Sequence, residues 1–147
     1  MKLSIYLASP WFIPETAERQ SRICNFIKDL GFNVLNPREM AVDNTSTKDA
    51  MTATFLNNIN DIEKADLIVA ITDGKDMGTI WEAGYAFGIK KPIVYYAETL
   101  GNNQFNLMLA KSAVGVARNE EGLKALLENP DTYHYNKFYD TYKGAIE

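Results

Sequence analysis

Cysteine and histidine are scarce in this sequence, and their scarcity excludes several kinds of chemistry. The 147 residues include one cysteine, Cys24, and one histidine, His134. A single cysteine cannot form an internal disulfide and is typical of a reducing compartment. A His/Cys metal cluster needs several such ligands, so we expect no metal and no other cofactor. A Ser-His-Asp triad would have to use His134, which no surrounding motif supports.

Long apolar runs and a large excess of one charge are also lacking. No apolar stretch approaches the roughly 20 residues that span a bilayer, and we expect the short segment 1–7 to be a strand rather than a signal peptide. The net charge of −4 argues against binding to nucleic acid or to an anionic membrane. Contents of 46% hydrophobic and 23% charged residues predict a cytoplasmic globular protein, with one domain over residues 1–147.

The common nucleotide-binding and nucleophile motifs do not occur either. The sequence has no G-x-G-x-x-G, no P-loop and no G-x-S-x-G. Carboxylate chemistry is what remains for a catalytic site.

The part of the chain between residues 65 and 97 has the pattern of a β-loop-α-β unit. The β-branched apolar run Leu67–Ile71 predicts a buried strand, and a polar loop, a helix from Thr79 to Ile89 and a second strand from Pro92 to Tyr96 follow it. Such a unit implies parallel strands, and ligands bind beyond the carboxyl ends of parallel strands. Asp76 and Glu82 are six residues apart at that edge.

The rest of the chain supplies further elements of the same kind. The apolar patterns predict strands at 2–8, 32–35 and 114–116, helices at 15–30, 48–64, 105–112 and 121–127, a polar loop at 38–47 and an aromatic tail at 133–147. The sum is a single-domain α/β sandwich of the doubly wound, flavodoxin- or Rossmann-like type. It would have about five mainly parallel strands flanked by helices.

Glu82 and Asp76 each have a structural and a functional interpretation. Thr79 and Glu82 fit a T-x-x-E capping box, and this pattern alone favours a helix cap. A carboxylate in the first helical turn would also be kept ionised by the helix dipole, which suits a nucleophile. The structural interpretation of Asp76 is a solvated loop residue. Its functional interpretation, beside Glu82, is a general acid, as in retaining glycosidases.

Four other residues have the same two interpretations. Tyr6 is either core packing or a hydrogen-bond donor to Glu82, because a buried hydroxyl needs a partner. Asn58, within a predicted helix, is either a surface residue or a site residue. Trp11 and Phe12 are either core or a surface that stacks on a planar base.

Several segments together resemble one enzyme family. IYLASPWF at residues 5–12, DMGTIWEAGYA at 76–86, FNLMLA at 105–110 and the ending FYDTYKGAIE at 138–147 are similar to segments of the nucleoside 2-deoxyribosyltransferases. The matches keep their order over nearly the whole chain. The second segment contains the family's D-x-G-x-x-x-E-x-G pattern.

The resemblance assigns roles to matching residues. Glu82 would be the nucleophile that takes the 2-deoxyribosyl group, and Asp76 would bind the base and exchange a proton with its ring nitrogen. Tyr6 would orient Glu82. Asn58 would lie near the sugar. Independently of the resemblance, Gly78 has no side chain and would let a ligand approach the backbone closely.

Other implied roles involve a second subunit. Asn106, Met108 and the terminal carboxylate of Glu147 would reach the site of a neighbouring subunit in a homo-oligomer with shared active sites. Trp11 and Phe12, together with Trp81 and a donated tail, would exclude water.

The implied reaction is base exchange in nucleoside salvage, between 2'-deoxynucleosides and free purine or pyrimidine bases, through a covalent deoxyribosyl-Glu82 intermediate. Two departures concern its specificity: the chain ends in Glu147 where some members have an aromatic residue, and Thr45, after the matching Asp43-Asn44, stands where some carry Gln. Two alternatives stay open. One is a deoxynucleoside 5'-monophosphate N-glycosidase, a hydrolase that must bind a phosphate. The other is a non-catalytic nucleotide-binding module in which Glu82 only caps a helix.

Overall fold

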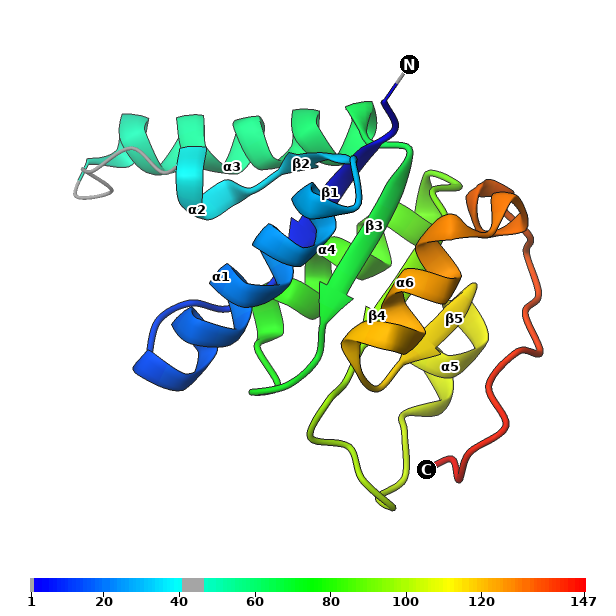
Figure 1. Cartoon of the computed structure of the whole chain (residues 1–147). Helices are drawn as coiled ribbons and strands as arrows, with labels where there is room; N and C mark the ends of the chain where they lie inside the picture. Colours follow the sequence, from blue (N-terminus) through cyan, green and yellow to red (C-terminus); the bar gives the residue numbers. More distant parts are fainter. Residues whose placement is uncertain (1, 41–46) are drawn as a thin grey trace.

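A five-stranded parallel sheet forms the centre of the computed structural model, which describes residues 2–40 and 47–147 (Figure 1). Its strands run in the order β2-β1-β3-β4-β5, and every neighbouring pair is parallel. The strands are β1 (Ser4–Ala8), β2 (Asn33–Leu35), β3 (Leu67–Ile71), β4 (Ile93–Tyr96) and β5 (Gly115–Ala117). This order is that of flavodoxin-like doubly wound sheets, so the predicted fold class is confirmed.

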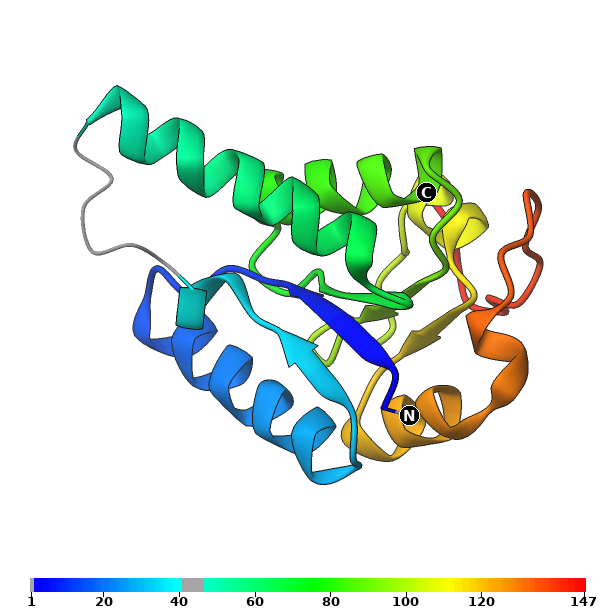
Figure 2. The same cartoon turned by 90° about the horizontal axis from the view of Figure 1, so that it is seen from above.

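Helices cover both faces of this sheet (Figures 1 and 2). One face carries α1 and α6, and the other carries α3, α4 and α5. Their bounds are α1 (Pro14–Asp29), α2 (Pro37–Met40), α3 (Lys48–Lys64), α4 (Met77–Gly88), α5 (Leu107–Ser112) and α6 (Glu120–Glu128), followed by a 3-10 turn at Pro130–Tyr133. The short α2 lies in a segment that the sequence predicts as loop. Among the described residues, no helix is long and apolar enough to cross a membrane.

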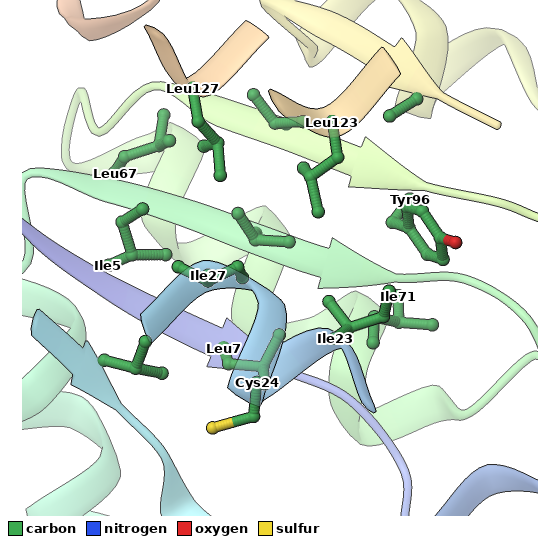
Figure 3. Close-up of a cluster of buried hydrophobic side chains, with 14 residues drawn as sticks. Ile5, Leu7, Ile23, Cys24, Ile27, Leu67, Ile71, Tyr96, Leu123 and Leu127 are labelled. Atoms are coloured by element: carbon green, nitrogen blue, oxygen red, sulfur yellow. The ribbon is translucent and has the colours of Figure 1, made fainter. Parts of the chain in front are cut away.

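Successive side chains along each strand point to opposite faces of the sheet, and this alternation divides the core into two layers. Ile5 and Leu7 of β1 point to the layer under α1 and α6, where Ile27 of α1 and Leu123 of α6 meet them (Figure 3). Tyr6 points to the opposite layer, under α3 and α4. Each fully buried Ile or Leu contributes about 1.5–3 kcal/mol to stability. These two layers therefore fix the strands rigidly and hold Tyr6 beneath the helices that carry the candidate site.

The start of α4 differs from the sequence prediction. The helix begins at Met77, and its N-cap is Asp76, whose side chain accepts a hydrogen bond from the Thr79 backbone N–H at 2.9 Å. The prediction of Thr79 as N-cap is therefore wrong by three residues. Asp is at least as good an N-cap as Thr. The carboxylate of Asp76, which comes first along the chain, therefore accepts the hydrogen bond from the Thr79 N–H.

The outer part of α3 also differs from expectation. The spacing of its apolar residues puts Met51 and Phe55 on one face of this helix together with Ile62, and such a face is expected to be buried. Met51 and Phe55 are nevertheless 50% and 52% exposed. The amino-terminal half of α3 extends past the sheet (Figure 2), so only Asp61 and Ile62 near its other end are buried. The helix therefore presents apolar side chains that this chain leaves half exposed.

Candidate active site

A hydrogen bond between β1 and α4 forms the centre of the candidate site. The hydroxyl of Tyr6 donates to Oε2 of Glu82. Tyr6 is fully buried in the middle of the sheet, and Glu82 lies one and a half turns into α4, at its sixth residue. The structure therefore brings together two of the residues named from the sequence, although their catalytic roles remain a prediction.

The environment of Glu82 raises its pKa to about 7. Burial is the largest cause, because it disfavours the charged carboxylate. The hydrogen bond from Tyr6 opposes this rise, and Asp76 adds to it when its carboxyl group is ionised. The expectation that the helix dipole keeps Glu82 ionised is wrong, since the dipole acts mainly within the first turn and Glu82 lies beyond it.

Tyr6 itself is held in its protonated form. Burial raises the pKa of its hydroxyl well above the ordinary value, and the charges of Glu82 and Asp61 raise it further. A phenol flanked by two carboxylates has a strong reason to keep its proton. Tyr6 can therefore serve as a fixed hydrogen-bond donor that orients Glu82. It does not serve as an acid or base that transfers a proton during the reaction.

Asp76 lies at the beginning of the same helix and caps it. Its Oδ2 accepts two hydrogen bonds, from the backbone N–H and from the hydroxyl of Thr79, both at 2.9 Å. The capping-box interpretation of Glu82 is wrong, because Asp76 holds the N-cap position and Thr79 the third helical position. Glu82 is therefore free of a capping role, which removes the structural explanation that the sequence favoured.

A cavity of about 340 Å³ opens between α3 and α4 beside Glu82. Its walls are mostly apolar, with one amide and one carboxylate, as is common in small-molecule sites. The lining residues are Phe55, Asn58, Ile59, Ile62, Gly78, Trp81 and Glu82. Of the expected substrate-binding residues, Asn58 and Gly78 therefore border the same space as Glu82.

Aromatic rings surround the mouth of this cavity. Trp81 stacks on Tyr85 with ring centroids 5.7 Å apart, and Phe55 approaches Trp81 at 5.7 Å. The rings of Trp11 and Phe12 lie beside each other, with centroids 5.0 Å apart. Neither residue lines the cavity, and Phe12 is 72% exposed. The described residues of one chain therefore do not close a lid over Glu82.

The carboxyl terminus lies beside the start of α5. The backbone of Glu147 exchanges hydrogen bonds with Phe105 and Leu107, and the Asn106 side chain caps α5 by accepting from the N–H groups of Met108 and Leu109. Asn106, Met108 and Glu147 thus cluster on an exposed surface. None of them lines the cavity beside Glu82.

Sequence reasoning missed one buried polar residue near this site and misassigned another. Asp61 of α3 is 8% exposed and affects Tyr6 electrostatically, and no motif marks it. Thr79 is 2% exposed, and the sequence did contain its signal. Asp76-x-x-Thr79 fits the spacing of an N-cap and its third helical position, which competes with the T-x-x-E reading.

A larger hollow of about 790 Å³ lies at the β5 edge, between α6 and the aromatic tail. Its lining has one carboxylate and one imidazole, Asp131 and His134, and both residues are exposed. The smaller cavity is the candidate active site, because a partly buried carboxylate with a raised pKa in a cleft is the better indicator of chemistry.

Two other expectations concern metals and the base-recognition loop. Within residues 2–40 and 47–147, no cluster of three His, Cys, Asp or Glu side chains could hold a metal ion. Asp43, Asn44 and Thr45, which match a family loop, lie outside the described residues.

Comparison with solved structures finds the same fold in known enzymes. The 2-deoxyribosyltransferase of Bacillus psychrosaccharolyticus matches with a TM-score of 0.78 and 26% identity, covering 93% of this chain and 99% of that chain. A 2-deoxyribosyltransferase from Leishmania mexicana matches with a TM-score of 0.64 and 22% identity over 87% and 99% of the two chains. A CMP N-glycosidase from Clostridium botulinum has a TM-score of 0.56 and 20% identity over 85% and 97%. The last two likenesses show the fold alone.

Comparison with curated protein sequences gives no match. The family model described as nucleoside 2-deoxyribosyltransferase, however, matches residues 5–127, a span that includes Tyr6, Asp76 and Glu82 and leaves out residues 1–4 and 128–147. The sequence resemblance is thereby confirmed, and the chain belongs to the nucleoside 2-deoxyribosyltransferase family.

Proposed function

We propose that this protein exchanges the base of a 2'-deoxynucleoside for another free base, through a covalent deoxyribosyl-Glu82 intermediate. The partly buried hydrogen bond from the Tyr6 hydroxyl to the Glu82 carboxylate is the observation that carries the proposal. It gives a carboxylate beside a cavity a fixed orientation, which a nucleophile requires. Nucleoside salvage in the cytoplasm is the cellular role that we propose for this exchange.

The reaction has two half-steps with complementary proton movements. A carboxylate oxygen of Glu82 attacks C1' of the sugar as the bond from C1' to the base breaks, and the departing ring nitrogen takes a proton from Asp76. An incoming base then attacks C1', gives its proton back to Asp76 and releases Glu82. Two inversions give net retention at C1', as in retaining glycosidases.

Access to the ionised carboxylate sets the rate of the first half-step. With the pKa of Glu82 at about 7, both protonation states are populated near neutral pH. Tyr6, which keeps its proton, favours the ionised state by its hydrogen bond. The burial that raises the pKa also keeps water away from the glycosyl-enzyme, and this exclusion favours transfer over hydrolysis.

Shared active sites in a homo-oligomer complete the proposal. Trp81 and Met77 of α4 are 52% and 88% exposed, and Met108 on α5 is 74% exposed. Apolar residues exposed around a site are typical of surfaces that another subunit covers. Asn106, Met108 and Glu147 would hold the 5' end of the sugar in the partner's site, while Trp11 and Phe12 would stack on the base.

The hydrolase alternative needs a cation for the substrate phosphate, and arginine is the usual choice. Arg19 and Arg22 pair with Glu98, Arg38 donates to α1, and Arg118 donates to Gly101 and Tyr142. No arginine is among the residues that line the cavity. We therefore favour nucleoside substrates over 5'-monophosphates.

A base-exchange assay tests the proposed function. The protein is mixed with thymidine or 2'-deoxyinosine and an excess of adenine in phosphate-free buffer, and the products are separated by chromatography. We expect 2'-deoxyadenosine to appear with wild type and not with Glu82→Gln. Free base and deoxyribose without a new nucleoside would indicate a hydrolase. No reaction of any donor, 5'-monophosphates included, would indicate a binding module.

A further inference from the structure

Thr79 is buried beside Asp76, and its side chain makes a hydrogen bond to it. The residue is 2% exposed, and its hydroxyl donates to Oδ2 of Asp76 at 2.9 Å. The hydroxyl is directed to the carboxylate that caps the helix.

The two donors of Thr79 make the two oxygens of Asp76 inequivalent. The backbone N–H of Thr79 also donates to Oδ2, at 2.9 Å, so this oxygen accepts two hydrogen bonds. In the described part of the chain, Oδ1 accepts no hydrogen bond that meets the same criteria. A protonated carboxyl has one O–H donor, and a proton on Oδ2 would compete with the two donors already there. The proton is therefore favoured on Oδ1.

We propose that Thr79 is a positioning residue, which directs the transferable proton to Oδ1 of Asp76 and fixes the plane of this carboxyl group. This inference rests on the proposed function, in which Asp76 gives a proton to the departing base. The proton leaves Oδ1 for the ring nitrogen as the bond to C1' breaks, and Oδ1 takes it back from the incoming base. Thr79 itself touches neither substrate nor reacting atoms.

Removing the hydroxyl tests the inference. Thr79→Val keeps the size of the side chain and the backbone N–H bond, and it removes one of the two donors to Oδ2. We expect kcat for base exchange to fall about 10- to 100-fold, because general acid catalysis contributes about 100- to 10,000-fold and only its alignment is lost. KM should change little. Thr79→Ser keeps a hydroxyl and should retain most of kcat, and Thr79→Ala is measured in parallel as a second variant without a hydroxyl.

A double-mutant cycle separates positioning from a general structural effect. In Asp76→Asn the group that carries the proton is gone, so adding Thr79→Val should cause no further loss of kcat. Exchange is followed with radiolabelled base over hours so that slow variants give a measurable rate. Thermal unfolding of each variant is recorded, and rates are measured at a temperature where all are folded.

The outcomes distinguish this inference from the function on which it rests. Wild-type kcat in both Thr79→Val and Thr79→Ala, with Glu82→Gln inactive, would overturn the role of Thr79 and leave the proposed function standing. An equal loss from Thr79→Val in the wild-type and Asp76→Asn backgrounds would also overturn it. Full activity of Glu82→Gln would overturn the proposed function itself.

Discussion

The Tyr6 hydroxyl donates to Oε2 of Glu82 across 76 residues of sequence, from the centre of the sheet to the helix that packs on it. This contact connects the rigid core to the candidate nucleophile. Because Tyr6 is fully buried in the core, its hydroxyl is a fixed donor that holds the Glu82 carboxylate in one orientation.

Glu82→Gln should abolish exchange while leaving the fold intact. The amide can still accept the hydrogen bond from Tyr6, but it cannot form the ester with C1'. We expect kcat to fall at least about 1,000-fold, as expected when a nucleophile is removed. Circular dichroism of the variant should match wild type. A loss of only a few fold would rule out Glu82 as nucleophile.

The same substitution should change how stability depends on pH. Burial raises the pKa of Glu82 from 4.5 to about 7 in the folded protein. Between these two values the folded state holds a proton that the unfolded state has lost, so wild type loses stability as pH rises and levels off above about 7. Relative to Glu82→Gln, wild type should lose about 3 kcal/mol between about pH 4 and pH 8.

Urea denaturation of both proteins at the two pH values measures this difference. The comparison isolates Glu82, since all other titrating groups are shared. Equal pH dependence of the two proteins would show that Glu82 is not buried as described.

Catalysis should have the opposite dependence on pH. The nucleophile must be ionised, so kcat/KM for the donor should fall about tenfold per pH unit below the Glu82 pKa of about 7. A pH–rate profile measures this fall, which is the acidic limb of the profile. A flat profile between about pH 5 and pH 8 would contradict an ionised Glu82 as the reacting form.

Tyr6→Phe should move that limb to higher pH. The Tyr6 hydroxyl lowers the pKa of Glu82, so its removal leaves burial, the largest cause of the raised pKa, unopposed. The variant should lose most activity near neutral pH and recover part of it in alkaline buffer. Tyr95→Phe, a second buried tyrosine, which bonds Ser112 and not Glu82, is the matched control and should keep the wild-type profile.

Mixed oligomers should reveal shared sites. Glu82→Gln lacks the nucleophile, and a chain truncated after Gly144 lacks the terminal segment that pairs with residues 105–107. Each should be inactive alone, while co-refolding equal amounts should restore about a quarter of wild-type activity if two subunits complete each site. If both variants are folded and their mixture is inactive, each subunit builds its active site alone.

Local patterns in the sequence were sufficient for most of the fold. Apolar, β-branched runs and helical stripes predict the strands and helices within a few residues, and α3 and β3 lie at the predicted bounds. The order of a β-loop-α-β unit also places Asp76 and Glu82 at one edge. These features depend on neighbours close in sequence, which is why they are readable without the structure.

The helix start shows where local reading fails. Asp76-x-x-Thr79 and Thr79-x-x-Glu82 are overlapping capping patterns, and both fit the sequence. Only the path of the chain after β3 decides which carboxylate meets the free N–H groups, and it selects Asp76.

The sequence by itself determined the parallel α/β sheet, the family motifs and the pair of carboxylates, because each follows from short-range periodicity and spacing. Only the tertiary structure decided that Tyr6 reaches Glu82, that burial raises the pKa of this carboxyl to about 7, and that Phe55 stays half exposed. These properties depend on which distant segments pack against each residue. Burial and hydrogen bonding are set by that packing, and a linear pattern does not contain it.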